Sequence, residues 1–162
     1  MSPHQQADRN RMDLVMFIDG LLPAARKRLV TLVDNAQVIE AAKLLGDAGT
    51  DILVVCGSDG LLAGVITKTD VVGQISQCQG CSCTTAVSSV MTQDVVVCRL
   101  GDRVDAAWSS MKDRGLKNIP ITDHESRPVG VLNARDALQA LLQEVENEES
   151  FLRDYVMTVG YH

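Results

Sequence analysis

The sequence is poor in aromatic residues, which make up 3% of its 162 positions: Phe17, Trp108, Phe151, Tyr155 and Tyr161. So few rings argue against a surface on which nucleobases stack, as in single-strand nucleic-acid binders. Basic residues are also scarce, with 15 Lys and Arg against 21 Asp and Glu and a formal charge of −6. This balance argues against non-specific nucleic-acid binding, because cations must neutralise the phosphates.

Long apolar runs are missing as well. The best candidate for a targeting segment, residues 14–18, ends after five residues at Asp19, whereas a signal peptide has an apolar core of about 7–15 residues. A membrane-spanning helix needs about 20, so we expect a cytoplasmic protein that does not enter membranes. Only His4, His124 and His162 are histidines, and no nucleophile stands with a base and an acid in a recognisable arrangement. We therefore do not expect an enzyme.

An internal repeat organises the chain. When the sequence is displaced by 66 positions, residues 30–75 align with the later part of the chain without a gap. Glycines and acids coincide, and apolar positions stay apolar, which indicates a duplicated unit. The identical pairs include Val38 and Val104, Ala41 and Ala107, Asp47 and Asp113, Gly49 and Gly115, Gly64 and Gly130, Val65 and Val131, and Asp70 and Asp136.

Each copy has the pattern of a β-α-β-β-α unit. An apolar extended segment (29–33 or 95–98) precedes a helix with apolar residues at i, i+3, i+4 and i+7 spacing. These residues are Val38, Ala41, Ala42 and Leu45 in one copy and Val104, Ala107, Trp108 and Met111 in the other. We expect Gly49 and Gly115 to end these helices. Two strands follow (52–56 and 62–66; 118–122 and 129–132), and a closing helix begins near Thr67 or Asn133, which are favourable N-cap residues.

The size of the copies predicts how they assemble. A unit of about 50 to 60 residues is near the limit for one independent hydrophobic core, so we expect the two copies to bury their sheets against each other with pseudo-twofold symmetry. The fold class is therefore α/β (α+β), with two β-α-β-β-α repeats and a long C-terminal helix. The expected organisation is a leader (1–12), a first repeat (13–76), a linker (77–87), a second repeat (88–143) and a helical tail (144–162).

The motifs of the repeat resemble those of the cystathionine-β-synthase (CBS) domain, and two copies in tandem resemble the Bateman module. Residues 64–70 read Gly, two apolar residues, Thr, two variable residues, Asp. Residues 90–92 match the segment that precedes a CBS copy, and residues 115–121 match the segment that leads into its second strand. The resemblance covers roughly residues 20–142. It implies regulation rather than catalysis, no required cofactor, and clefts between the copies that bind adenosine-containing ligands such as AMP, ADP, ATP or S-adenosylmethionine.

The resemblance assigns the ribose hydroxyls to Thr67 and Asp70 in the first copy. Asn133 and Asp136 are their counterparts in the second copy, where Asn replaces the usual Thr or Ser. A carboxylate suits this role, because it accepts two charge-assisted hydrogen bonds from a cis-diol. The other candidate nucleotide-binding residues are one threonine in the opening segment and three cations beside the motifs: Thr31, Lys68, Lys117 and Arg135.

Structural roles explain the same residues without a ligand. An N-cap Thr67 and a first-turn Asp70 stabilise a helix, and the three cations equally fit a solvated surface. Lys117 aligns with Asp51, so we expect the two clefts to differ in charge and one site to be the stronger. With so few rings, adenine would be held by aliphatic side chains and backbone. The net negative charge favours AMP or S-adenosylmethionine over metal-free ATP unless the cations converge.

Three of the five cysteines, Cys78, Cys81 and Cys83, lie close together in the linker. Thiolates at this spacing could converge on zinc or an iron–sulfur centre, but no fourth ligand lies nearby in sequence, and exposed thiols that form a reversible disulfide are the alternative. Cys56 and Cys98 lie in apolar runs and are expected in the core. Two other functions therefore stay open: a thiol- or metal-dependent sensor and a ligand-free oligomerisation scaffold.

The tail predicts a partner surface. Apolar residues continue beyond Asp136 at helical spacing: Leu138, Leu141, Leu142, Val145, Leu152, Tyr155, Val156 and Val159. This helix is longer than the repeat requires, and it either folds back on its own module or contacts a second subunit. We favour a homodimer, because CBS pairs of the kind that this chain resembles commonly dimerise. No output domain is recognisable in the chain, so we expect it to signal to an unidentified effector protein.

Overall fold

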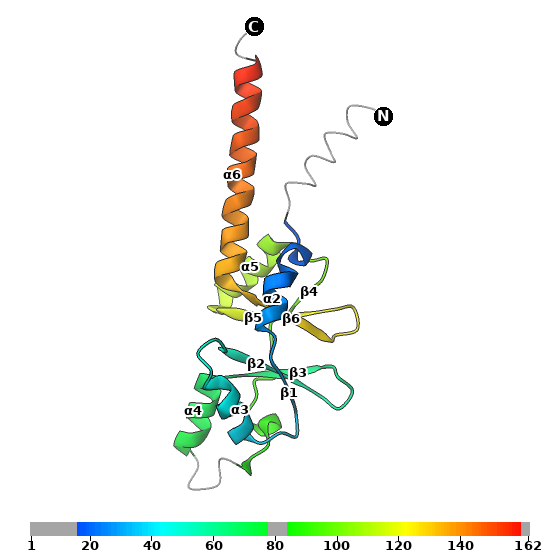
Figure 1. Ribbon diagram of the computed structural model, residues 1–162, viewed down its shortest axis with the longest axis vertical. Coiled ribbons are helices and arrows are strands. Elements are labelled where there is room, and N and C mark those ends of the chain that lie inside the picture. Colours follow the sequence, from blue (N-terminus) through cyan, green and yellow to red (C-terminus); the bar gives the residue numbers. More distant parts are fainter. Residues whose placement is uncertain (1–15, 78–83, 160–162) are drawn as a thin grey trace.

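Two three-stranded sheets form the centre of the molecule (Figure 1). The computed structural model describes residues 16–77 and 84–159. In each sheet the middle strand pairs in parallel with the first strand and antiparallel with the third. The first sheet contains β1 (Thr31–Val33), β2 (Ile52–Cys56) and β3 (Leu62–Thr67), and the second contains β4 (Cys98–Arg99), β5 (Asn118–Thr122) and β6 (Pro128–Asn133).

Helices cover the outer face of each sheet, and the two sheets face each other (Figure 1). The helices of the first repeat are α3 (Val38–Leu45) and α4 (Lys68–Gln77), and those of the second are α5 (Val104–Arg114) and α6 (Ala134–Val159). Short helical segments of the described residues precede each sheet: η1 (Ile18–Leu21) and α2 (Leu22–Arg28) before the first, and η3 (Val87–Ser89) before the second. The predicted fold class, two repeats and a C-terminal helix, is confirmed.

The inner faces of the two sheets share one apolar cluster. Ile52, Val54 and Val65 from the first sheet pack with Val131 from the second, and each of them is at most 8% exposed. Full burial of one such side chain contributes about 1.5–3 kcal/mol. The intervening strand residues point to the helices instead: Leu53, Val55 and Ile66 in the first sheet, and Ile119, Ile121 and Leu132 in the second. Both faces of each sheet are therefore buried.

Each repeat is completed by the segment that precedes the other repeat in sequence. Ile18 and Ala25, which come before β1, are buried in the core of the second repeat, and α2 packs along β6. Val87, which comes before β4, is buried in the core of the first repeat, where its N–H donates to the carbonyl of Ala36. This exchange ties the two repeats together beyond the contact between their sheets.

The equivalent glycines Gly64 and Gly130 make room for these exchanged segments. A Cβ at Gly64 would lie 2.7 Å from the carbonyl oxygen of Thr92 and 2.8 Å from the sulfur of Met91, and one at Gly130 would lie 3.0 Å from Ala25. The coincidence of the two glycines in the repeat therefore reflects close backbone approach on both sides of the module.

The two helix ends predicted at glycines differ. Gly115 follows α5 with a φ of 64°, in the left-handed conformation that was expected. The prediction for Gly49 was wrong, because α3 ends at Leu45 and Gly46 closes it with right-handed backbone angles. The residues from Gly46 to Gly49 form a turn before β2 instead of another helical turn.

The two described cysteines are protonated thiols in apolar surroundings. Cys98 is buried as expected, and burial, reinforced by the charge of Asp102, raises its pKa to about 12. Cys56 is half-buried beside the cluster between the sheets, and burial together with Asp59 raises its pKa. Neither thiol is therefore a ready thiolate at neutral pH. Of the helices in the described residues, none combines the length and the apolarity that a bilayer crossing requires.

Replacing Gly64 by Ala tests the close approach at β3. We expect Gly64→Ala to lower the free energy of unfolding by about 1–3 kcal/mol, the usual cost of overpacking. Gly73→Ala is the matched control, because a Cβ at this position of α4 has no neighbour within 4 Å and Ala favours a helix over Gly by up to about 1 kcal/mol. Urea denaturation measures both. Equal stability of Gly64→Ala and wild type would contradict the packing of residues 91–92 on β3.

Candidate functional site

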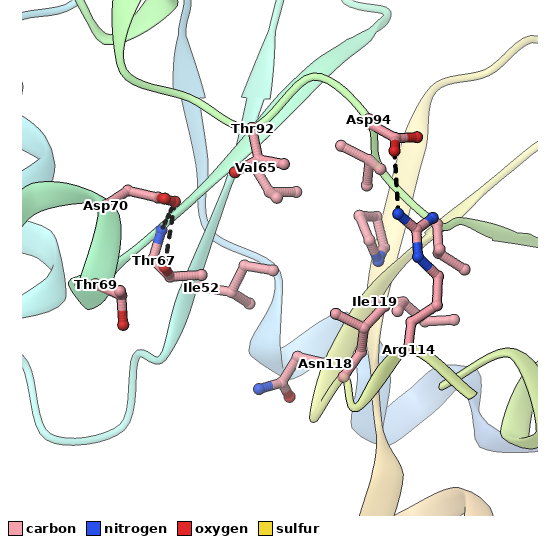
Figure 2. Close-up of a pocket in the computed structure, with 14 residues that line it drawn as sticks. Ile52, Val65, Thr67, Thr69, Asp70, Thr92, Asp94, Arg114, Asn118 and Ile119 are labelled. Atoms are coloured by element: carbon pink, nitrogen blue, oxygen red, sulfur yellow. Dashed lines mark hydrogen bonds and ion pairs between the residues drawn. The ribbon is translucent and has the colours of Figure 1, made fainter. Parts of the chain in front are cut away.

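The first cleft lies between the two repeats and has a volume of about 320 Å³ (Figure 2). Its polar part comes from the end of β3 and the start of α4, and its opposite wall comes from β5 and the segment before β4. The lining residues are Ile52, Val65, Thr67, Thr69, Asp70, Thr92, Asp94, Val95, Val96, Arg114, Leu116, Asn118, Ile119 and Pro120.

Asp70 and Thr67 form a capping pair at the start of α4. One carboxylate oxygen of Asp70, Oδ2, accepts hydrogen bonds from the backbone N–H of Thr67 at 2.9 Å and from its hydroxyl at 3.1 Å (Figure 2). The bond to the backbone N–H is one half of a capping box, so Asp70 has the structural role expected of a first-turn acid. The Thr67 hydroxyl donates to Asp70 in this arrangement and does not act as the cap acceptor. Among the described residues no hydrogen bond engages the other oxygen, Oδ1, so the carboxylate retains an acceptor for a ligand.

The rest of the first cleft is mainly aliphatic. Ile52 and Val65 line it from the first sheet, and Val95 and Pro120 line it from the segment before β4 and from β5. These side chains offer apolar surface to a flat heterocycle without any ring to stack on it. The cleft thus combines an acceptor for hydroxyl groups with walls that suit an uncharged base.

The second cleft is the counterpart of the first under the 66-residue shift, and its volume is about 550 Å³. It opens at the end of β6 and the first turn of α6, where the first cleft has β3 and α4. Its lining residues are Arg28, Asp51, Lys117, Asn133, Ala134, Arg135 and Asp136.

An ion pair holds the carboxylate of the second cleft. The guanidinium of Arg28 lies 2.6 Å from Oδ2 of Asp136, and their side chains are 34% and 23% exposed. Asp136 is the counterpart of Asp70, but its partner is a cation from α2 instead of a hydroxyl group. A ligand hydroxyl that approaches Asp136 therefore meets a carboxylate that is already charge-paired.

Asn133 caps α6 and connects the two clefts. Its Oδ1 accepts a hydrogen bond from the backbone N–H of Arg135 at 2.9 Å, and its Nδ2 donates one to Oδ1 of Asn118 at 3.0 Å. Because Asn118 lines the first cleft, this bond joins the walls of both sites. The first repeat has Ile52 and Thr67 at the equivalent positions, so the bond has no counterpart there.

The structure divides the predicted site residues between the clefts. Thr67 and Asp70 line the first cleft, and four others line the second: Lys117, Asn133, Arg135 and Asp136. Lys68 lines neither, but its ammonium group lies 3.9 Å from Asp51 at the second cleft. Thr31 is exposed on β1 and is not a lining residue of either cleft.

Sequence reasoning missed four charged residues of the clefts. One of them is Asp51, whose alignment with Lys117 was expected to give the two clefts different charges, but both residues line the second cleft. Asp94 and Arg114 form an ion pair of 3.0 Å at the first cleft (Figure 2), and Arg28 pairs with Asp136 at the second. One signal was available, because Asp94 and Arg28 occupy equivalent positions in the 66-residue register. Their partners are not equivalent, however, and the register therefore could not predict either pair.

The proposed thiol site lies outside the described residues, since Cys78, Cys81 and Cys83 fall between 77 and 84. Within residues 16–77 and 84–159 no three His, Cys, Asp or Glu residues are grouped so that they could hold a metal ion.

Comparison with known proteins identifies the family of this chain. The model of the CBS domain matches residues 22–77 and 87–143. Homoserine O-acetyltransferase of Methanococcoides burtonii is 24% identical over 110 residues, which cover 68% of this chain and 22% of that protein. L-aspartate semialdehyde sulfurtransferase of Methanocaldococcus jannaschii is 25% identical over 107 residues, 66% of this chain and 20% of that protein. This chain thus spans about a fifth of these curated relatives.

Solved structures give the same result for the fold. The CBS-domain protein ATU1752 from Agrobacterium tumefaciens has a TM-score of 0.65 and 27% identity, over 77% of this chain and 98% of that one. The CBS pair of MJ0100, in complex with 5′-methylthioadenosine and S-adenosylmethionine, has a TM-score of 0.64 and 22% identity, over 80% and 97%. CBSX2 in complex with AMP has a TM-score of 0.63 and 20% identity, over 74% and 91%. The two repeats, their topology and the matched segments together show that this chain belongs to the CBS domain family.

Proposed function

We propose that this chain is a regulatory module that binds adenosine-containing small molecules in the two clefts between its CBS repeats. The observation that carries the proposal is the repeated carboxylate. Asp70 and Asp136 occupy equivalent positions in the two clefts, each three residues after a polar residue at the start of the helix, Thr67 or Asn133. A ribose cis-diol that donates to such a carboxylate gains hydrogen bonds to a charged acceptor, which are stronger than neutral ones.

The named ligands of two structural neighbours support this assignment. MJ0100 is described with 5′-methylthioadenosine and S-adenosylmethionine, and CBSX2 is described with AMP. These neighbours share the fold at low identity, so the argument for this chain depends on its own clefts. An aliphatic wall beside a hydroxyl acceptor is the combination that an adenosine needs.

The position of α6 suggests how binding would be signalled. Its first turn, with Ala134, Arg135 and Asp136, lines the second cleft, and the rest of the helix projects away from the module (Figure 1). A ligand that contacts α2, β6 and α6 at once favours one packing of these elements over others. We therefore assign the output to an effector protein that reads this arrangement, and no catalytic step to this module.

Removing both carboxylate charges tests ligand binding. We expect Asp70→Asn combined with Asp136→Asn to weaken binding of AMP, 5′-methylthioadenosine and S-adenosylmethionine by at least about tenfold, because a hydrogen bond to a charged group contributes about 1.5–3 kcal/mol. Asn retains an oxygen acceptor that can cap α4. Titration calorimetry measures the affinities, and Glu40→Gln, which neutralises an exposed acid on α3, is the control. Undiminished affinity in the double variant would remove the ribose role.

We propose further that α6 pairs with α6 of a second copy. Leu138, Leu142, Val145 and Leu152 are 40–58% exposed, and with Glu149 they follow the alternating four- and three-residue spacing of a coiled-coil seam. Charge complementarity favours a second copy in parallel register. Two of the positions that flank the seam are occupied by Glu148 and Arg153, and in a parallel pair Glu148 of one copy lies opposite Arg153 of the other.

Substitutions in the seam test this dimer. We expect Leu142→Asp to shift the mass in solution from that of a dimer to that of the 17.5 kDa chain, because a carboxylate at a seam position cannot be buried without a partner. Gln143→Asp adds the same charge beside the seam and should leave the dimer intact. Glu149→Leu should strengthen it by removing a like-charge contact. Light scattering over a dilution series measures the masses, and a Leu142→Asp variant that stays dimeric would exclude α6 as the interface.

A further inference from the structure

The two clefts differ in charge although they are equivalent in position. The ionisable residues that line the first cleft are two carboxylates and one cation, Asp70, Asp94 and Arg114. The second cleft is lined by three cations and two carboxylates, Arg28, Lys117, Arg135, Asp51 and Asp136. The first cleft therefore carries net negative charge and the second net positive charge.

Pairing within the first cleft strengthens the difference. Arg114, the one cation among the described residues that line this cleft, already contacts Asp94 at 3.0 Å. Asp70 has hydroxyl and amide partners but no cation among the described residues. A phosphate group that entered here would meet an unneutralised carboxylate, and like charges at short range repel.

Pairing within the second cleft leaves cations available. Lys68 neutralises Asp51 from the rim at 3.9 Å. Lys117 and Arg135 are exposed, and in the described part of the chain neither of them forms an ion pair. Arg28 pairs with Asp136, which is the carboxylate that a ribose would occupy. A third cation therefore lies beside the carboxylate that ligand hydroxyls would bind, within the lining of the same cleft.

We propose that the two clefts select adenosine ligands by the charge of the 5′ group. The first cleft takes an uncharged thioether or a cationic sulfonium derivative. The second takes a 5′-phosphate, with Lys117, Arg135 and Arg28 as the cations that line it. The inference rests on the proposed adenosine-binding function. It deepens that function by assigning a different ligand class to each site, so that one module can report on two kinds of adenosine compound at once.

Two probes that share the adenosine part separate the clefts: AMP and 5′-methylthioadenosine. We expect the full chain to bind both without competition. Lys117→Gln should weaken AMP by about tenfold, the effect expected for loss of one charged hydrogen bond, and leave 5′-methylthioadenosine unchanged. Asp70→Asn should do the reverse. Lys112→Gln removes the same charge from an exposed position of α5 that lines neither cleft, and it should change neither affinity. Added salt should weaken AMP more than 5′-methylthioadenosine.

The outcomes distinguish this inference from the function on which it rests. If the wild-type chain binds neither AMP nor 5′-methylthioadenosine, the proposed function and the charge selection are both wrong. If the two probes compete with each other, or if Lys117→Gln weakens the affinity for both of them equally, adenosine binding is supported but charge selection is overturned. Binding of AMP that depends on Asp70 and not on Lys117 also overturns it, because the phosphate would then occupy the negative cleft. Binding of only one probe overturns the assignment of the other cleft.

Discussion

The structure depends on the mutual burial of two small sheets. A three-stranded sheet has two apolar faces, and the helices of its own repeat cover only the outer one. The inner face, with Ile52, Val54 and Val65, is covered by the second sheet, and each repeat alone would expose it to water. The first cleft is a continuation of this contact, since Ile52 and Val65 also line it. A ligand there would extend the shared core, and its binding would stabilise the packing of the two repeats.

Much of the repeat could be predicted from the sequence because it depends on local patterns. The spacing of apolar residues predicted both middle strands, β2 and β5, with their exact bounds, and the buried face of α5 through Val104, Ala107 and Met111. The coincidence of glycines and acids under the 66-residue shift identified Asn133 and Asp136 as the equivalents of Thr67 and Asp70 in the second repeat. These features need only strand and helix periodicity, which few competing interactions can override.

The features that the sequence could not predict depend on contacts between distant segments. The apolar character of Ile18 and Ala25 indicates burial but not the sheet against which they pack, and they pack in the repeat that is farther along the chain. The pair Arg28 and Asp136 joins residues more than a hundred positions apart. Gly49 was expected to end the first helix as Gly115 ends the second, but the first helix is shorter and ends before Gly49. Symmetry in sequence is thus a weaker constraint on loops than on strands.

The pattern of identity and difference between the copies follows from what each position must do. A side chain at Gly64 would collide with the exchanged segment, and one at Gly130 would press on Ala25. The strand residues between the sheets must stay apolar to be buried. Residues at the mouths of the clefts are exposed, so a change of charge there has little effect on folding. Thr69 in the first cleft and Arg135 in the second are such a pair. The packing of the module can therefore remain close to twofold while the chemistry of its two clefts becomes opposite in charge.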